Sequence, residues 1–263
     1  MIVYPNVKVN VGLNVLRKRE DGYHDLETLF VPYHGISDVL EIVPAEKFSI
    51  DIVKEGGVDW DPMTDLTVRA YDLLKADYDI PPVSIRLEKR SPVGAGLGGG
   101  SSDAAFALRC MNELFGLNLS DAALAGYAAR LGSDCAFFVY NRPMFGSGRG
   151  EVLEDFVLEG LDYGQEGAED CPYKLVVTVP QGIAVSTADA YRGIVPAVPE
   201  TPLREILSRP ISSWKDTLAN DFETTVFAKY PRLAEIKDSL YAGGAVYASM
   251  SGSGSSLYAI YEK

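Results

Sequence analysis

Hydrophobic and polar positions alternate one by one near the start of the chain. The polar row includes Lys8 and Asn10, and the apolar row is Val7, Val9, Val11, Leu13 and Val15. Successive side chains of a β-strand point to opposite faces, so this alternation predicts a strand with one buried face. Lys8 and Asn10 are therefore expected to point the same way. Further strands are predicted over residues 28–31, 38–43, 48–53, 83–88 and 175–179.

The period changes to that of a helix from Ser101 onward. Apolar residues recur at helical spacing at Ala104, Ala107, Leu108, Met111, Leu114 and Phe115. Ser101, Ser102 and Asp103 stand at the start and are predicted to cap this helix. Other helices are predicted over 65–75, 120–131 and 187–192, and a final strand pair flanks a glycine-serine loop.

Strands and helices follow one another without a strict strand-helix-strand rhythm, which favours an α+β fold over a parallel α/β one. At roughly 150 residues per domain, 263 residues fit one large domain or two modest ones. We predict two lobes, an N-terminal lobe over residues 1–150 and a C-terminal lobe over residues 151–263.

The charge balance narrows the possible partners. The chain has 24 Lys and Arg against 37 Asp and Glu, a net charge of −13. A chain this acidic has no long-range attraction for nucleic acid or anionic lipid. We therefore predict small-molecule partners, with no nucleic acid and no membrane, and any bound phosphate must be held by local geometry.

Cysteine and histidine usage narrows the picture further. The three cysteines contain no C-x-x-C pair, which favours a reducing compartment over a disulfide framework. Two histidines are too few for a His-rich metal centre. The first residues lack a basic region followed by an apolar stretch, so no secretory signal is expected and a cytoplasmic location is predicted.

The uncharged segment 239–261 is rich in Gly and Ser, and we predict a loop between strands rather than a membrane span.

The segment from Pro92 to Ser102 carries the clearest chemistry in the chain. It is rich in glycine and lies between a predicted strand and a predicted helix. Glycines let a backbone approach a ligand closely, and the free N–H groups at a helix start bind anions. A flexible linker is the alternative, but a linker is not usually followed at once by a strongly periodic helix. The predicted phosphate-binding residues are Pro92, Val93, Gly94, Ala95, Gly96, Leu97, Gly98, Gly99, Gly100, Ser101 and Ser102.

Two familiar kinds of phosphate loop fit this segment poorly. Gly94-x-Gly96-x-x-Gly99 satisfies the dinucleotide-binding pattern, but the chain about 20 residues further on is predicted to be helical instead of a strand ending in an acidic residue. No lysine follows the last glycine as in a Walker A loop, and protein-kinase motifs are absent. A nicotinamide-dependent oxidoreductase is therefore a distant alternative.

The loop resembles the phosphate loop of the small-molecule kinase family that groups galactokinase, homoserine kinase, mevalonate kinase and phosphomevalonate kinase. Ser251-Gly-Ser-Gly-Ser255 is similar to the C-terminal glycine motif of that family. Three further blocks resemble the branch that phosphorylates 4-diphosphocytidyl-2-C-methyl-D-erythritol. These blocks are Lys8-Val-Asn10, the stretch Lys18-Arg-Glu-Asp-Gly-Tyr-His24 with Leu26-Glu-Thr-Leu-Phe30, and Leu131-Gly-Ser-Asp134 with Phe137-Phe-Val139.

The resemblance implies a two-lobed α+β kinase fold with the active site in the cleft between the lobes. Asp134 matches the catalytic aspartate of the family and Lys8 its lysine partner. A carboxylate beside an alcohol can orient it and accept its proton, and an adjacent ammonium keeps the carboxylate ionised. Without the resemblance, Asp134 would be read as a helix cap and Lys8 as an exposed charge on a strand.

The resemblance also implies which residues bind the substrate. Tyr23 and His24 match a cytosine-contacting pair, and Asn10 matches a polar contact to the substrate. Thr187 and Tyr191 occupy the stretch where the family has a threonine and a second aromatic that sandwiches the base. From the residues alone, Tyr23-His24 would be a packed turn and Tyr191 a core residue.

Two positions depart from the family pattern. Asp65 stands where an asparagine is expected near the nucleotide base. Asp103 also replaces an asparagine, and it brings a negative charge close to the phosphates. Asp103 is expected either to help hold Mg²⁺ or to serve only as a carboxylate at a helix start. No metal ligand is assigned.

The resemblance therefore implies a cytoplasmic kinase with ATP as co-substrate and Mg²⁺. The implied reaction transfers the γ-phosphoryl group of ATP to the 2-hydroxyl of the cytidine diphosphate polyol, in the non-mevalonate route to isoprenoid precursors. A kinase acting on mevalonate or homoserine is an alternative, but those substrates carry no cytosine for Tyr23 and His24. A nucleotide-binding sensor without turnover is a second alternative, which retention of Lys8 and Asp134 disfavours.

Overall fold

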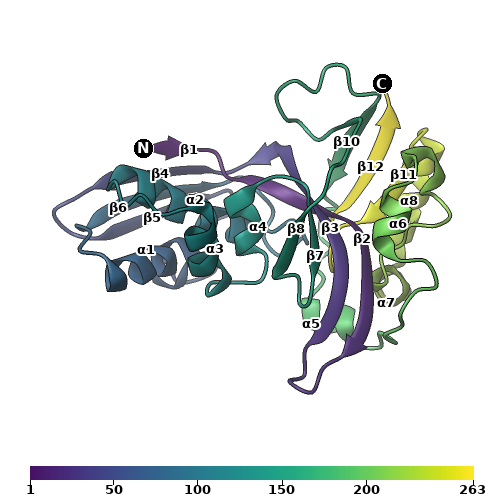
Figure 1. The fold of residues 1–263 in the computed structure, drawn as a ribbon, viewed down its shortest axis with the longest axis horizontal. Coiled ribbons are helices and arrows are strands. Elements are labelled where there is room, and N and C mark those ends of the chain that lie inside the picture. The colour runs from purple at the N-terminus through teal and green to yellow at the C-terminus, as the bar shows by residue number, and fades with distance from the viewer. The chain divides into compact units, whose positions relative to one another are not determined.

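The chain packs into two compact units, each built from separate segments of the sequence. The structure is a computed structural model that describes residues 1–263 (Figure 1). Unit 1 contains Met1–Val7, Ile36–Val93 and Gly98–Arg142, and unit 2 contains Lys8–Gly35, Gly94–Leu97 and Pro143–Lys263. The predicted α+β fold with two lobes is confirmed. The boundary at residue 150 stays a prediction, because the compact units divide the chain by contacts at several points along it.

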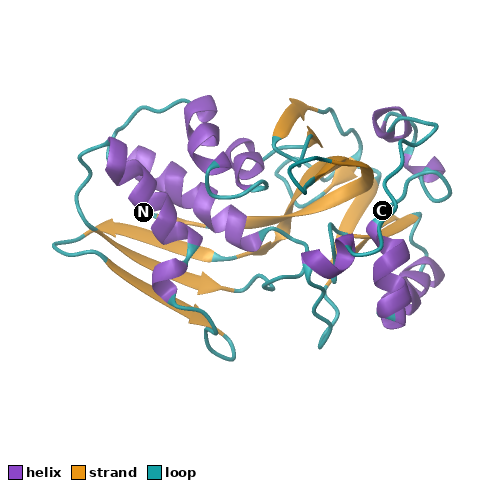
Figure 2. Ribbon diagram, turned by 90° about the horizontal axis from the view of Figure 1, so that it is seen from below, coloured by secondary structure: helices purple, strands orange, loops and turns teal.

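Unit 1 is a four-stranded sheet covered on one face by helices (Figure 2). The strand order is β1-β4-β6-β5, with antiparallel pairing except between β5 and β6. The strands are β1 (Ile2–Val3), β4 (Val39–Pro44), β5 (Ser49–Lys54) and β6 (Val83–Lys89). The helices are α1 (Leu66–Asp77), α2 (Gly99–Leu114), α3 (Asp121–Ala129) and α4 (Cys135–Tyr140), with a 3-10 turn at Pro62–Thr64.

Side chains cap two helices of unit 1, and a glycine begins a third. Asp65 accepts a hydrogen bond from the Thr67 backbone N–H at 2.9 Å and so caps α1, and Ser120 caps α3. The prediction that Ser101, Ser102 and Asp103 cap α2 is wrong. Gly98, at a φ of 71°, turns the backbone so that α2 begins at Gly99, and the three residues lie inside the first turns.

Unit 2 is built on two four-stranded sheets, β2-β3-β7-β8 and β11-β12-β10-β9. The strands of the first sheet are β2 (Asn6–Lys18), β3 (His24–Ser37), β7 (Met144–Ser147) and β8 (Val152–Asp155). Those of the second are β9 (Leu161–Asp162), β10 (Tyr173–Thr178), β11 (Tyr247–Met250) and β12 (Leu257–Glu262). The helices are α5 (Thr187–Tyr191), α6 (Leu203–Leu207), α7 (Phe222–Lys229) and α8 (Pro231–Ala242), with a 3-10 turn at Ile211–Ser213.

Strand β2 is more deeply buried than its alternating pattern predicts. Every residue from Asn6 to Leu13 is buried, so the prediction of a single buried face is wrong. The polar side chains Lys8 and Asn10 are each only 3 % exposed. They are hydrogen-bonded inside the protein instead of facing water, which is how a polar row can be buried.

The uncharged segment 239–261 forms the end of α8, the strands β11 and β12 and the loop between them, as predicted. Antiparallel pairing of β11 with β12 satisfies the backbone groups on either side of the loop. None of the helices combines the length and the apolar character needed to cross a membrane.

Candidate active site

Lys8 lies in the middle of a hydrogen-bonded group on β2. Its Nζ donates to Asn10 Oδ1 at 2.5 Å, which confirms that the two side chains point the same way. The ammonium also lies 5.4 Å from the centroid of the buried Phe30 ring. A buried ammonium needs such partners because transfer out of water is costly.

Asn10 holds Lys8 through an amide whose two ends both have protein partners. Its Nδ2 donates to Thr28 Oγ1 at 3.1 Å, and the Thr28 hydroxyl donates to the Gly12 carbonyl at 2.6 Å. Asn10 therefore fixes the ammonium on β2 by way of β3. The direct substrate contact expected of Asn10 stays a prediction.

The first half of the glycine loop contacts the glycine-serine loop backbone to backbone. The Ser251 hydroxyl donates to the Gly96 carbonyl at 3.0 Å and accepts from the Asn10 N–H at 3.2 Å. Gly96 has a φ of +77°, and a Cβ there would lie 2.2 Å from the Ser251 carbonyl oxygen. Position 96 therefore has to be glycine for the loops to meet. The Lys8 N–H donates to the Leu97 carbonyl at 2.9 Å, which joins β2 to the same cluster.

Asn220 organises the glycine-serine loop and carries no sequence motif. Its Nδ2 donates to the carbonyls of Met250 at 2.8 Å and Gly252 at 2.9 Å. Its Oδ1 accepts from the Phe222 N–H at 3.0 Å, and the residue is 2 % exposed. The Asn220 amide nitrogen thus holds the glycine-serine loop, while the amide oxygen joins the residue to the start of α7. Sequence reasoning missed it because a single asparagine before a helix is read as an ordinary cap.

An aromatic pair is attached to the same loop. His24, at the start of β3, stacks on Tyr191 of α5 with ring centroids 4.7 Å apart and an angle of 20°. Tyr191 packs edge-on against Phe222. Thr187, one helical turn before Tyr191, lies 3.3 Å from Ser253 between hydroxyl oxygens. The structure thus brings His24, Thr187 and Tyr191 together, and links α5 to the glycine-serine loop.

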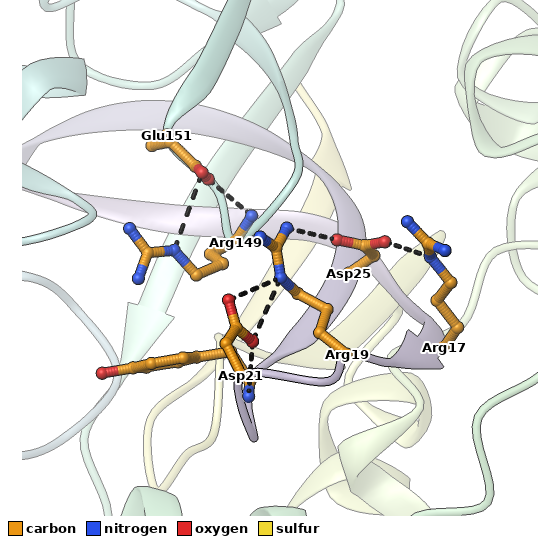
Figure 3. A network of polar contacts seen from close by, with 7 residues as sticks. Arg17, Arg19, Asp21, Asp25, Arg149 and Glu151 are labelled. Carbon is orange, nitrogen blue, oxygen red and sulfur yellow. Dashed lines mark hydrogen bonds and ion pairs between the residues drawn. The ribbon is translucent and has the colours of Figure 1, made fainter.

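A charged network at the turn between β2 and β3 includes Arg17, Arg19, Asp21 and Asp25 (Figure 3). The Tyr23 N–H donates to Asp21 Oδ1 at 3.1 Å. The Arg149 guanidinium stacks 4.8 Å from the Tyr23 ring centroid, and the ring is more than half exposed. Arg19 pairs with Asp25 at 2.8 Å and with Asp21 at 3.0 Å, and Arg17 also pairs with Asp25. Burial and nearby Lys18 lower the pKa of His24, which favours the neutral ring.

The second half of the glycine loop and Asp134 belong to unit 1. Residues Gly98–Ser102 form the start of α2, where the first N–H groups have no partner within the helix and can bind an anion. Asp134 immediately precedes α4 and is half-buried, with no side-chain capping bond to that helix. The catalytic roles expected of Lys8 and Asp134 stay predictions.

A buried charge cluster, formed by Asp38, Lys89, Ser91 and Asp103, lies where the glycine loop begins and ends. Lys89 Nζ donates to Asp38 Oδ2 at 2.5 Å, Asp103 Oδ2 at 2.7 Å and Ser91 Oγ at 2.9 Å. Asp103 is 1 % exposed and its Oδ1 has no hydrogen-bond partner. Asp103 therefore faces the protein interior and its cluster partners.

The pKa values of the two carboxyl groups in this cluster are shifted in opposite directions. Burial raises the pKa of Asp103 well above its ordinary value, against the attraction of Lys89. Burial also acts on Asp38, but Lys89 and the hydrogen bonds from Ser91 outweigh it and hold the pKa of Asp38 below its usual range. One ammonium cannot fully compensate two buried carboxylates.

No group of three or more His, Cys, Asp and Glu side chains is arranged to hold a metal ion. Mg²⁺ in nucleotide sites is usually held by one or two carboxylates together with substrate phosphates and water. The free N–H groups at the start of α2 offer a place for the phosphates in that mode of binding. The side chains present do not form a protein-only metal centre.

Family models match the chain in two places. The GHMP kinases N terminal domain matches residues 65–142, and the GHMP kinases C terminal domain matches residues 203–263. A protein from Bacteroides fragilis named 4-diphosphocytidyl-2-C-methyl-D-erythritol kinase is 46 % identical over 99 % of this chain and 92 % of its own length. The chain belongs to the GHMP kinase family. A relative of the same name from Parabacteroides distasonis is 44 % identical over 100 % of this chain and 92 % of its own.

A solved structure has a similar fold over nearly the whole of this chain. The crystal structure of 4-(cytidine 5'-diphospho)-2C-methyl-D-erythritol kinase is 33 % identical to this chain, with a TM-score of 0.79. The match covers 98 % of this chain and 89 % of the other. The family recognised from the glycine loop is confirmed, with ATP as the co-substrate of a GHMP kinase.

Replacing Asn220 with aspartate tests its hold on the glycine-serine loop of this GHMP kinase. Aspartate keeps the acceptor for Phe222 but removes both donors, and we expect the folded protein to lose about tenfold or more in turnover, because the loop is misplaced. The measurement is kcat per folded molecule. Asn112→Asp is the matched control, since the Asn112 amide also holds a loop, at Leu119. Equal losses in the two variants would contradict the assignment.

The raised pKa of Asp103 makes the stability of this GHMP kinase depend on pH. The folded state binds the Asp103 proton more tightly than the unfolded state, so this residue's contribution falls as pH rises above about 4. We expect Asp103→Asn to raise the melting temperature at pH 7, with a gain that vanishes as pH falls toward 4. Asp38, whose pKa is lowered, is present in both the original protein and Asp103→Asn, so its own pH dependence is common to the two. Asp65→Asn is the control, because aspartate and asparagine both cap a helix start. A gain in melting temperature that does not depend on pH, or one that Asp65→Asn shares, would contradict this prediction.

Proposed function

We propose that this GHMP kinase transfers the γ-phosphoryl group of ATP to the 2-hydroxyl of 4-diphosphocytidyl-2-C-methyl-D-erythritol, a step in the non-mevalonate route to isoprenoid precursors. The observation that carries the proposal is the stacked pair His24 and Tyr191. Thr187 joins this pair to the glycine-serine loop that also contacts Asn10. An aromatic site for a base beside the phosphate loops suits a substrate with a cytidine at one end and an alcohol at the other.

The proposed chemistry assigns one role to each polar residue. Asp134 orients the polyol hydroxyl and accepts its proton while the hydroxyl oxygen attacks the γ-phosphorus and ADP leaves. Lys8, fixed by Asn10, offsets the negative charge that develops on the transferring group. Residues Pro92–Ser102 bind ATP, and the backbone N–H groups of the glycine stretch within them bind its phosphates. Mg²⁺, when bound with ATP, supplies charge neutralisation on the phosphate oxygens.

The base site must open before it can hold cytosine. Ring centroids 4.7 Å apart leave no space for a third ring between His24 and Tyr191. Cytosine therefore enters by separating the two rings, with Tyr191 keeping its edge contact to Phe222. The neutral form of His24 favours this exchange, because a neutral ring gives up its stacking contact without also moving a charge. Tyr23, more than half exposed, offers a second ring face.

A GHMP kinase for mevalonate or homoserine is the alternative within the family. Neither acceptor carries a base, so the aromatic pair would have no function in that enzyme. A sensor without turnover would have no need for an ammonium held as firmly as that of Lys8.

The three cysteines are free, with two of them buried, and we place the reaction in the cytoplasm on that ground.

Purified protein is expected to consume ATP with 4-diphosphocytidyl-2-C-methyl-D-erythritol and not with mevalonate or homoserine. Coupled detection of ADP with each acceptor measures this preference. Faster turnover with mevalonate or homoserine would overturn the proposed substrate.

The same assay tests the catalytic aspartate. Asp134→Asn keeps the size of the side chain but removes the proton acceptor, and we expect turnover to fall by at least ~100-fold with ATP affinity largely unchanged. Binding of ATP is measured separately by calorimetry. Unchanged turnover would remove Asp134 from the mechanism.

The base site is tested at Tyr191. Tyr191→Ala removes a stacking ring, and we expect the KM for the cytidyl substrate to rise about tenfold or more, with the KM for ATP unchanged. Tyr191→Phe keeps the ring and should stay near the original value. Tyr163→Ala is the matched control, since Tyr163 stacks on His34 elsewhere in unit 2. A rise in both alanine variants, or in neither, would argue against the base site.

A further inference from the structure

Lys89 stands just before the glycine loop but does not face a ligand site. Its side chain is only 4 % exposed, and its ammonium donates to Asp38, Ser91 and Asp103. A lysine beside a phosphate loop is usually expected to bind phosphate. Here the two carboxylates and one hydroxyl use all three donors of the ammonium, so Lys89 acts inside the protein.

Lys89 joins the two ends of the glycine loop. Its own backbone lies at the end of β6, where the loop departs, while Asp103 lies in α2, which the loop enters. Their side chains meet at 2.7 Å. The chain between them, from Arg90 to Ser102, is therefore closed by one buried ion pair.

Asp38 fixes the first end of the loop independently. Its Oδ1 accepts from the backbone N–H groups of Arg90 at 2.6 Å and Ser91 at 2.7 Å. Its Oδ2 accepts from the Ser91 hydroxyl at 2.7 Å as well as from Lys89. A carboxylate that binds two successive N–H groups sets the direction in which the backbone leaves the strand.

Gly99 lets the two ends come this close. A Cβ at position 99 would lie 2.3 Å from Ser91 Oγ and 3.3 Å from Lys89 Nζ. The backbone of the first α2 residue thus rests directly on the cluster. Cluster and helix start form one packed unit, with no space for a side chain between them.

We propose that Asp103 is a positioning residue for ATP, which acts through Lys89 to hold the start of α2 against the end of β6 and so sets the geometry of the phosphate-binding N–H groups. The proposal rests on the proposed binding of ATP at this loop. Loop amides bind phosphate well only when they converge, and a loop with one loose end loses that convergence. Asp103 thereby affects ATP binding without touching ATP.

The test compares Asp103→Ala with Asp103→Asn. Alanine breaks the link to Lys89 but leaves the balanced Asp38–Lys89 pair, so the interior holds no uncompensated charge and the variant should fold. We expect its KM for ATP and its calorimetric Kd for MgATP to rise about tenfold, with the KM for the acceptor alcohol within twofold. Asparagine keeps an acceptor for Lys89, and its KM for ATP should return to within twofold of the original.

Leu108→Ala, in the buried face of α2, controls for loss of stability alone. It should lower the melting temperature at least as much as Asp103→Ala while leaving the KM for ATP unchanged. An unchanged KM for ATP in Asp103→Ala, an equal rise in Asp103→Asn or an equal rise in Leu108→Ala would each overturn the proposal. Because MgATP binding is measured without acceptor, the result is independent of which alcohol the enzyme phosphorylates.

Discussion

The structure depends on one close approach of backbone to backbone, between Gly96 and Ser251. A Cβ at position 96 would overlap the Ser251 carbonyl oxygen, so two loops separated by about 150 residues can meet only because no side chain intervenes. The Ser251 hydroxyl then ties Gly96 to the backbone of Asn10. That contact connects strand β2, which carries Lys8, with the glycine-serine loop and the first half of the glycine loop. Asn220 holds the glycine-serine loop by donating to two of its carbonyl groups.

Buried charge is handled differently in the two units. In unit 2 the Lys8 ammonium donates to a neutral amide oxygen and lies beside an aromatic ring. In unit 1 Lys89 is enclosed by two carboxylates and serves structure. At the turn between β2 and β3, also in unit 2, the exposed Arg17 and the partly exposed Arg19 pair with carboxylates.

Local pattern was enough to predict much of this molecule. Alternation at residues 7–15 and helical spacing after Ser101 contributed to the α+β prediction, and the resemblance of the glycine loop and the other motifs led to the family. Pattern could not show that β2 is buried on both faces, because burial of Lys8 depends on partners from β3. It also placed the start of α2 two residues late, since a left-handed glycine rather than a side chain begins the helix. Asn220 and Asp38 act through contacts distant in sequence, which no local motif records.

The interleaved segments of the two units have a consequence for biosynthesis. Every residue of unit 1 has been made once the ribosome has passed Arg142, so that unit can fold on the nascent chain. Unit 2 begins with Lys8 but needs β12, which ends at Glu262, to complete its second sheet. The pairing of β12 with β10 and β11 therefore forms only after β12 has been translated. Long-range closure of this kind slows folding, so the second sheet of unit 2 is completed after the folding of unit 1 can begin.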